Sequence, residues 1–599
     1  MKKLVILITT FLLLVRPSLA SGLNNKFGIH LAQPHAEDLQ SAARLVNSTG
    51  GDWGYVTLVI QENDRKKDKW QAVFDQLRQL HLIPIIRLAT QADGDNWERP
   101  KKEGADDWVN FLDSLNWVVK NRYVILFNEP NHGSEWGGEV DAEDYAKVVL
   151  SFAKKLKEKN PDFFVMLAGL DASAPQGPPA YEDEEVFFKK MLIDSVSDSL
   201  PSVVAPSGRL EKSLHAVGNP SSSTPINIFN YVDGWASHSY PNPDFSGSPW
   251  DSGRGTIRTY QWELGLLKSL GVEKELPVFI TETGWERQVQ SSKFKVQSYL
   301  DENTVADYFR IVFENVWLPD ERVVAVTPFI FNYQGQPFLD FSWQKLQSSD
   351  FYQQYYTVQS LEKIHGEPEQ IEKGGINFSL PMNLVAQSNY QFDIKLKNDG
   401  QAIWDKDNSY SLTIVSDSEG KLEYLIDDLK DIRPFEEKEL RFNFKTGKEN
   451  KNNSLRFVLN KNGKKVLESN DWKFQILPLP NLKFELNLFP KLNDQGKDFE
   501  IQIFDKKENL IFQKKNLPAF AGQGSLDNIQ NIVLGERYRV VVLKPYYLPR
   551  QNFIVFNQQE NKIKFKPLAP LDFSLDGRLS SQDLISLIKH PFLFKLFFP

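Results

Sequence analysis

Residues 123–131 read YVILFNEPN, a short apolar run that breaks directly into polar residues and a proline. A run of this length between polar segments is typical of a buried strand, and Pro130 prevents the strand from continuing. The same pattern returns at residues 277–285, PVFITETGW. The two segments therefore predict two buried strands, with Glu129 following the end of the first and Glu282 at the end of the second.

Outward from these segments, residues 26–365 alternate short apolar runs with segments of helical spacing. In one such segment Trp70, Val73 and Leu77 fall on one helix face. Eight strands alternating with helices predict a parallel sheet with right-handed crossovers. The count of eight favours an α/β fold of the closed (β/α)₈ type, a TIM barrel, over an open doubly wound sheet. The six other strand candidates are Phe27–Leu31, Trp53–Ile60, Ile83–Leu88, Phe163–Gly169, Val232–His238 and Val323–Phe331.

After about residue 367 the composition shifts toward Asn, Lys and Glu, with apolar residues at every second position in 390–397 and 440–444. This alternation is typical of strands with one buried face. We expect two β-sandwich-like modules here, the first of them immunoglobulin-like. The predicted boundaries are a signal peptide at 1–20, a catalytic domain at 21–366, β modules at 371–478 and 479–568, and a last segment at 569–599.

The chain has 599 residues and a net charge of −8, and no basic run interrupts it. This charge argues against a nucleic-acid partner, which requires clustered cations. Lys2 and Lys3, a short apolar stretch and the small residues of 18–20 are typical of a secretory signal, with an uncleaved membrane anchor as the alternative. We therefore expect an extracellular or cell-surface protein, and the absence of cysteine is compatible with that location for a chain of this size.

Polar residues at the carboxyl ends of barrel strands form the active sites of that fold. Glu129 and Glu282 would stand on opposite sides of one barrel mouth. Cleavage of a glycosidic bond needs such a pair, with one proton donor for the leaving oxygen and one carboxylate facing the anomeric carbon. The structural alternatives are a Glu-Pro step that only begins a loop and a Glu282 that only pairs with a nearby arginine.

The motifs FNEPN (127–131) and ITETGW (280–285) resemble those of a large clan of retaining barrel glycosidases that contains many cellulases, mannanases and xylosidases. The resemblance covers roughly the first 365 residues. It implies that Glu129 is the acid/base, that Asn128 binds the sugar 2-hydroxyl, and that Glu282 is the nucleophile.

The sixth predicted strand, VDGWASHSYP (232–241), extends the resemblance. It implies that Tyr240 bonds the nucleophile and that His238 lines the pocket, a core histidine being the alternative. Several families of the clan carry an arginine at the second strand end and a tryptophan at the eighth. Here the nearest arginine is Arg87, on the third strand. This departure means that the resemblance does not identify the family within the clan or its substrate.

Trp136 and Trp285 follow predicted strand ends, where a sugar could stack on their rings, with core packing as the alternative. The resemblance implies that the two carboxyl groups lie about 5 to 5.5 Å apart, which leaves no room for an inverting water, so we expect a retaining hydrolase of a poly- or oligosaccharide. No cofactor is required for this chemistry, and the barrel sequence has no H-E-x-x-H motif. The alternative function is a non-catalytic carbohydrate-binding or adhesion protein of the cell surface.

Near the end of the chain, oxygen-bearing residues recur at the spacing of a calcium loop, with Gly577 at the sixth position. The predicted ligands are Asp572, Ser574, Asp576, the carbonyl of Arg578, and Asp583. The loop resembles one half of a dockerin, an EF-hand-like calcium module, which implies bound Ca²⁺ and a cohesin-like partner. A dockerin has two such loops and this chain shows one, with Asp at position twelve in place of Glu. An exposed Asp-Gly turn is the alternative.

Overall fold

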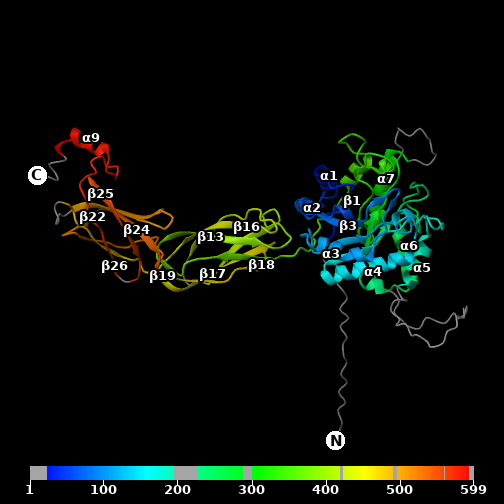
Figure 1. Cartoon of the computed structure of the whole chain (residues 1–599), viewed down its shortest axis with the longest axis horizontal. Coiled ribbons are helices and arrows are strands. Elements are labelled where there is room, and N and C mark those ends of the chain that lie inside the picture. Colours follow the sequence, from blue (N-terminus) through cyan, green and yellow to red (C-terminus); the bar gives the residue numbers. More distant parts are fainter. Residues whose placement is uncertain are drawn as a thin grey trace, which may run out of the picture. The chain divides into compact units, whose positions relative to one another are not determined.

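The computed structural model describes residues 23–194, 227–287, 300–417, 422–489, 496–558 and 560–592. The chain divides into two compact units, Met1–Ile371 and Glu372–Pro599 (Figure 1). The predicted signal peptide at 1–20 lies outside the described residues. Among the helices that are described, none is both long and apolar enough to cross a membrane.

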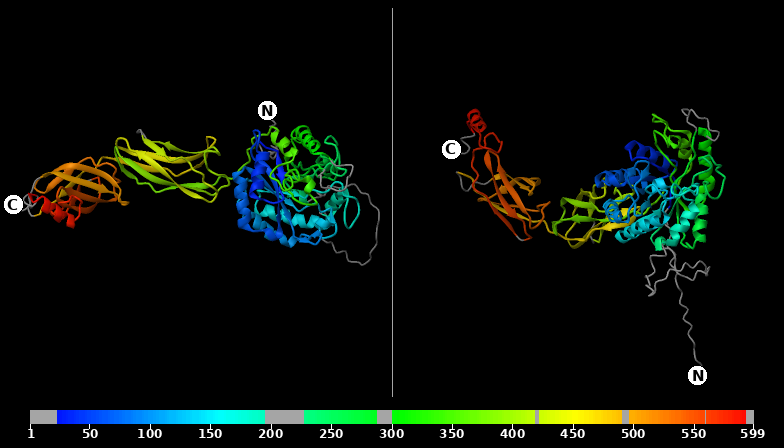
Figure 2. Two further views of the ribbon diagram at one scale, coloured as in Figure 1. Left: turned by 90° about the horizontal axis from the view of Figure 1, so that it is seen from above. Right: turned by 45° about the vertical axis from the view of Figure 1, so that its right-hand side comes forward.

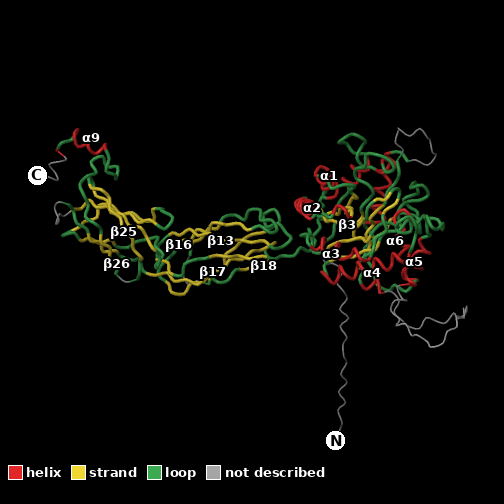
Figure 3. The backbone as a smooth tube through the Cα atoms, in the orientation of Figure 1, coloured by secondary structure: helices red, strands yellow, loops and turns green. Residues whose placement is uncertain are grey.

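The first unit alternates strands with helices, and the helices lie outside the strands (Figure 3). Its strands are β1 (Gly28–His30), β2 (Gly54–Gln61), β3 (Leu82–Ala89), the short hairpin β4 (Ala92–Asp93) and β5 (Asn96–Trp97), β6 (Arg122–Leu126), β7 (Phe163–Leu167), β8 (Trp235–His238), β9 (Val278–Glu282) and β10 (Val323–Val326). Its helices are α1 (Ala36–Val46), α2 (Lys67–Gln79), α3 (Ala105–Asp113), α4 (Ala142–Lys159), α5 (Glu184–Asp194), α6 (Thr259–Ser269), α7 (Glu302–Val312) and α8 (Gln353–Ser360).

The long strands of the first unit form two parallel sheets. One has the order β1-β2-β3-β6-β7 and the other the order β10-β9-β8. Two single parallel bridges join the sheets, Met166 to Gly234 between β7 and the start of β8, and Phe27 to Val326 between the start of β1 and β10. Counting these bridges, each of the eight strands has a parallel neighbour on both sides, so their carboxyl ends gather at one face of the unit.

Burial explains why these segments form strands. β3 reads LIPIIRLA, a nearly continuous apolar run, as expected for a parallel strand covered on both faces. The helices contribute one apolar face each, and in α2 this face includes the fully buried Trp70, Phe74 and Leu77. Together these side chains form one large hydrophobic core.

The eighth strand is shorter than the sequence predicts. The prediction ran over 323–331, whereas β10 ends at Val326. Pro328 has no N–H to give to a neighbouring strand. Beyond it the N–H of Phe329 donates to the carbonyl of Thr283 at 2.9 Å, and the N–H of Phe331 to that of His30 at 2.8 Å. The segment after β10 therefore crosses the strand ends and does not extend the sheet.

The second unit contains two groups of strands (Figure 2). Each group has its own hydrophobic core. The first group has the sheets β11-β13-β16-β15 and β12-β19-β17-β14, with β18 paired to β17. Its strands are β11 (Gly374–Phe378), β12 (Asn383–Val385), β13 (Asn389–Asn398), β14 (Tyr410–Ser416), β15 (Glu423–Ile426), β16 (Glu437–Lys445), β17 (Asn450–Lys461), β18 (Lys464–Glu468) and β19 (Trp472–Leu477).

The second group has the sheets β23-β20-β26 and β22-β21-β24-β25. Alternation of buried and half-buried residues, as in β21, places one face of the sheet on the core. A loop and one helix, α9 (Ser581–Lys589), follow these strands. The strands are β20 (Leu482–Glu485), β21 (Gly496–Phe504), β22 (Leu510–Ala519), β23 (Gln523–Leu526), β24 (Arg537–Lys544), β25 (Tyr547–Val555) and β26 (Asn561–Lys564).

Candidate active site

The two predicted glutamates lie at the carboxyl ends of β6 and β9. Glu282 is the last residue of β9 and is 7% exposed, whereas Glu129 is half-buried in the turn that follows β6. That turn is strained, because Phe127 has φ 73° and Glu129 has φ 28°, values that only glycine adopts freely. The Phe127 ring packs edge-on against Trp136 and Phe152 and holds the turn in this conformation. Such strain concentrates at functional sites.

The two carboxylates face each other across a histidine. One oxygen of Glu129, one oxygen of Glu282 and a ring nitrogen of His238 all lie within 4.8 Å of one another. His238 ends β8, and its Nδ1 is 2.7 Å from Glu129 Oε1 and 3.9 Å from Glu282 Oε2. Burial acts to lower the pKa of His238, but the charge of Glu282 and the bond to Glu129 raise it above its ordinary value. The raised pKa favours the protonated imidazole, which can donate a hydrogen bond to Glu129.

Glu282 is surrounded by groups that favour its ionised form. Arg87 Nη1 lies 2.5 Å from Glu282 Oε1, and the Tyr240 hydroxyl donates to Oε2 at 3.1 Å, the contact expected from the sequence. His30 Nδ1 is 3.7 Å from Oε1. Burial alone would raise the pKa of Glu282, but the positive charges of His238 and Arg87 lower it to about 2. The side chain is therefore a carboxylate at neutral pH.

Arg87 also connects the two strand ends. The same Nη1 donates to Asn128 Oδ1 at 2.5 Å, so one guanidinium bonds both the predicted nucleophile and the residue before the predicted acid. Arg87 comes from β3, which pairs with β6. A planar cation with several donors is suited to fixing two acceptors at once. The position of Asn128 therefore depends on the same cation as the position of Glu282.

Two further residues of the site were not predicted. His30, at the end of β1, is buried, and its Nδ1 has no hydrogen-bond partner among the residues that the structure describes. Glu135 lies in the loop after β6, where burial and the charge of Glu129 raise its pKa to about 7. The only feature of the sequence that could have indicated a role for His30 in the site was its position at the end of the first strand. Glu135 gave no signal, because a loop glutamate is usually exposed.

The prediction that Trp136 and Trp285 bind substrate needs correction. Trp136 is 0% and Trp285 2% exposed, so neither presents a ring face to a ligand. Their indole N–H groups donate to Asp144 at 3.1 Å and to the carbonyl of Gly247 at 2.8 Å. We assign both rings to core packing.

The C-terminal loop brings three of the predicted calcium ligands together. Oxygen atoms of Asp572, Asp576 and Asp583 lie within 4.8 Å of one another. Asp572 is 5% exposed, and its Oδ1 has no hydrogen-bond partner within the described part of the chain. The backbone N–H of Arg578 donates to Asp576 Oδ1 at 2.9 Å. These carboxylates are oxygen ligands of the kind that Ca²⁺ prefers.

Asp583 also has a structural role in this loop. Its Oδ1 accepts from the N–H of Ser574 at 2.9 Å and from the Ser574 hydroxyl at 2.7 Å. Its Oδ2 accepts from the N–H of Ser580, the residue that caps the start of α9. Position twelve of the predicted loop thus closes the loop onto the helix by hydrogen bonds alone.

No protein-family model matches the sequence, and no curated protein matches it. An FMN-binding beta-glucuronidase from Facaelibacterium prausnitzii L2-6 is 9% identical, with a TM-score of 0.34 over 76% of this chain and 56% of that one. This chain thus spans little more than half the length of that enzyme.

An endo-beta-1,4-glucanase from Xanthomonas axonopodis pv. citri is 11% identical over 56% of this chain and 98% of its own, with a TM-score of 0.36. A beta-xylosidase from Caulobacter crescentus CB15 is 10% identical over 88% and 98%, with a TM-score of 0.34. At such TM-scores these similarities carry no weight in assigning a reaction to this chain.

Proposed function

We propose that this chain is a retaining glycoside hydrolase that cleaves O-glycosidic bonds of a poly- or oligosaccharide by double displacement. Glu129 acts as acid/base and Glu282 as nucleophile. The observation that carries the proposal is the pair itself, two carboxylates with oxygen atoms within 4.8 Å of each other, which come from the ends of the non-adjacent strands β6 and β9, one of them held ionised. A separation this short favours direct attack by a carboxylate, because an inverting enzyme needs room for a water between the groups.

The fold that we propose for this unit is a closed (β/α)₈ barrel. The two parallel bridges that join β7 to β8 and β10 to β1 support closure. All the site residues then come from strand ends at one face of the barrel, the face where such barrels place their chemistry. For the second unit, two sheets around each of two separate cores support two β-sandwich-like modules.

In the first step, a carboxylate oxygen of Glu282 bonds to the anomeric carbon while the bond from that carbon to the leaving oxygen breaks. The leaving oxygen takes a proton from Glu129 and departs as an alcohol. Tyr240 and Arg87 hold Glu282 by its two oxygens, which orients it for attack. Fixing the reacting groups in this way lowers the entropic part of the barrier.

In the second step, Glu129 takes a proton from water, and the water oxygen bonds to the anomeric carbon. The bond between that carbon and Glu282 breaks, which restores the Glu282 carboxylate. Glu129 is thereby protonated again, and the configuration at the anomeric carbon is retained overall. Asn128, placed by Arg87, lies beside the acid, where it would bind the sugar hydroxyl next to the anomeric centre.

Two alternatives use the same side chains. Glu129, His238 and Glu282 are residue types that also bind metal ions. Arg87, however, places a positive charge 2.5 Å from Glu282, and a divalent cation on that carboxylate would have to lie beside it. A non-catalytic carbohydrate-binding protein would not need a nucleophile whose pKa is lowered to about 2. Both points favour the hydrolase.

The test is release of reducing sugar from cellulose, mannan, xylan and β-1,3-glucan by the full chain and by Glu129→Ala and Glu282→Ala. We expect release from at least one polysaccharide, lost in both variants. Azide should restore cleavage to Glu282→Ala with formation of a glycosyl azide, because a small anion can take the place of the missing nucleophile. Release that persists in Glu282→Ala would refute the assignment, and full activity only after addition of a metal would favour the metal centre.

We further propose that the C-terminal loop binds Ca²⁺ through Asp572, Asp576 and Asp583, with the Ser574 hydroxyl and the Arg578 carbonyl completing the set. The partnerless and buried Asp572 Oδ1 supports this, because a cation would give that oxygen the partner it lacks. Calorimetric titration of the full chain with CaCl₂ should show one site that is lost in Asp572→Asn. Asp527→Asn, an exposed aspartate of the same unit, is the matched control. Equal binding by both variants would place the ion elsewhere.

Docking of this segment to a cohesin-like partner stays a prediction from the resemblance of its loop. In α9 the side chains of Leu584, Ile585 and Ile588 are at least half exposed, which gives a partner an apolar face to contact. Secretion and association with the cell surface also stay predictions.

A further inference from the structure

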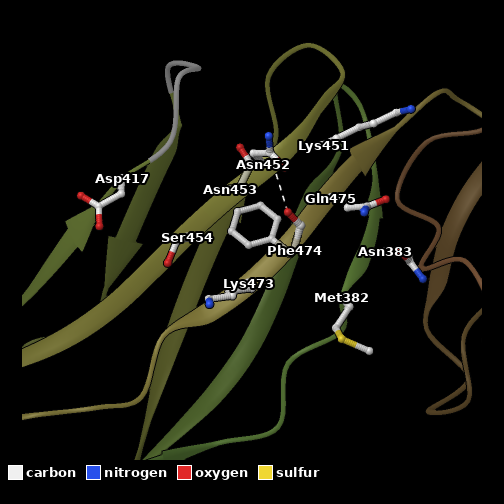
Figure 4. Close-up of a pocket in the computed structure, with 10 residues that line it drawn as sticks. All are labelled: Met382, Asn383, Asp417, Lys451, Asn452, Asn453, Ser454, Lys473, Phe474 and Gln475. Atoms are coloured by element: carbon white, nitrogen blue, oxygen red, sulfur yellow. Dashed lines mark hydrogen bonds between the residues drawn. The ribbon is translucent and has the colours of Figure 1, made fainter.

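A groove of about 550 Å³ crosses one sheet of the first β module, far along the chain from the catalytic residues (Figure 4). Its lining comes from β12, β19 and β17, which are neighbours in one sheet, and from the residue that follows β14. The volume lies within the range of about 300–1,000 Å³ that is typical of ligand sites. The lining residues are Met382, Asn383, Asp417, Lys451, Asn452, Asn453, Ser454, Lys473, Phe474 and Gln475.

The groove contains a β-bulge. Asn450 of β17 pairs with Ile476 of β19, and Asn453 pairs with Phe474, so that two residues of β17 lie opposite Gln475 alone. These two residues, Lys451 and Asn452, are both exposed, although neighbours in a regular strand point to opposite faces. Bulges of this kind redirect side chains and are common beside binding sites.

The side chain of Asn453 stabilises the bulge with its amide N–H groups, and its carbonyl oxygen stays unpaired among the described residues. Its Nδ2 donates to the carbonyl oxygens of Asn450 at 3.0 Å and Phe474 at 3.3 Å, the second of which is the dashed line in Figure 4. Its Oδ1 is buried and has no partner among the described residues, and the residue as a whole is only 4% exposed. Native proteins seldom leave a buried acceptor in this state. The two bonds from Nδ2 hold the bulge that exposes Lys451 and Asn452.

The lining chemistry identifies the kind of ligand. The exposed amides of Asn383, Asn452 and Gln475 both donate and accept hydrogen bonds, as sugar hydroxyls do. Two lysines stand against one aspartate in the lining, too few cations for a polyphosphate chain. Met382, 69% exposed, offers one apolar contact at the edge of the groove.

We propose that this groove, lined by the bulge of β17 and by β12 and β19, binds a neutral polysaccharide chain through hydrogen bonds to side-chain amides. It is an accessory glycan site of the second unit, and glycan binding at it requires no catalysis. An enzyme that carries such a site stays on its polysaccharide between cleavage events, because binding at two sites raises the effective concentration of the second.

The test uses the full chain carrying Glu282→Gln, so that no probe is consumed. Its migration in native gels containing hydroxyethylcellulose, galactomannan, arabinoxylan or laminarin gives an affinity for each polysaccharide. In that background Asn452→Ala combined with Gln475→Ala removes two amides of the groove. The matched control is Gln391→Ala, an exposed glutamine on β13 in the opposite sheet of the same module.

We expect at least one polysaccharide to retard the chain, with an affinity about ten-fold weaker in the groove variant and unchanged in the control, since each lost hydrogen bond weakens binding a few-fold. Equal retardation of the groove variant and its parent would overturn the proposal, because all binding would then belong to the catalytic unit. Absence of retardation by all four polysaccharides would also overturn it. Circular dichroism of both variants shows whether the module stays folded.

Discussion

Replacing Arg87 with methionine removes the cation that contacts both Asn128 and Glu282 and keeps a side chain of similar length. A neighbouring cation lowers a carboxyl pKa by about 1–3 units. The pKa of Glu282, about 2 with Arg87 in place, should therefore rise to about 3–5. A nucleophile reacts as the carboxylate, so activity is present above this pKa and is lost as the pH falls through it. The acid limb of the pH profile should move upward by the same amount.

Arg87→Met should also lower kcat about 100-fold at neutral pH, because Asn128 and Glu282 lose the group that fixes their positions. The assay is kcat/KM between about pH 3 and 8, measured with an aryl glycoside of the sugar found in the polysaccharide panel. Arg99→Met is the control, since Arg99 pairs with Glu139 at 2.9 Å and contacts neither carboxylate of the pair. An acid limb in Arg87→Met that coincides with the wild-type limb would refute the electrostatic role assigned to Arg87.

Three other changes have defined outcomes. Tyr240→Phe removes the hydroxyl 3.1 Å from Glu282 and should lower kcat about 10- to 100-fold without changing Tm; an unchanged kcat would show that the bond is not used. Glu184 and Glu263 are a buried acidic pair, and burial, followed for Glu184 by the charge of its neighbour, raises the pKa of both. The folded state then holds more protons than the unfolded state, so stability falls as pH rises above the ordinary glutamate pKa, and thermal melts of Glu184→Gln between pH 5 and 8 should show a smaller fall. Trp136→Ala should destabilise the first unit by about 3–5 kcal/mol in denaturant melts, because a fully buried ring is lost.

The strands of the first unit could be predicted because their apolar runs are nearly continuous, as the prediction of Ile83–Leu88 within β3 shows. The prediction failed at the eighth strand, where apolar residues continue past Pro328 but the backbone turns away to bond Thr283 and His30. The hydrophobic pattern of a sequence predicts which side chains are buried, but it does not predict which carbonyl accepts the hydrogen bond of a given backbone N–H.

For the site, Glu129 and Glu282 could be found because each breaks an apolar run at a strand end. His30 could not, since a histidine beside apolar residues has the same pattern whether it faces the core or Glu282. Trp136 and Trp285 show the opposite error. An aromatic residue after a strand end has one sequence pattern, and only the packing around it decides whether its ring is available to a ligand.

The left-handed conformation of Phe127 has a consequence for redesign. A non-glycine residue in this region costs about 1–3 kcal/mol, yet glycine at this position would remove the ring that packs against Trp136 and Phe152. The direction of Glu129 is therefore fixed by the aromatic packing beneath the turn together with its bond to His238. Under the proposed function, loops grafted beyond Trp136 to accept a different sugar should therefore leave Glu129 in its place.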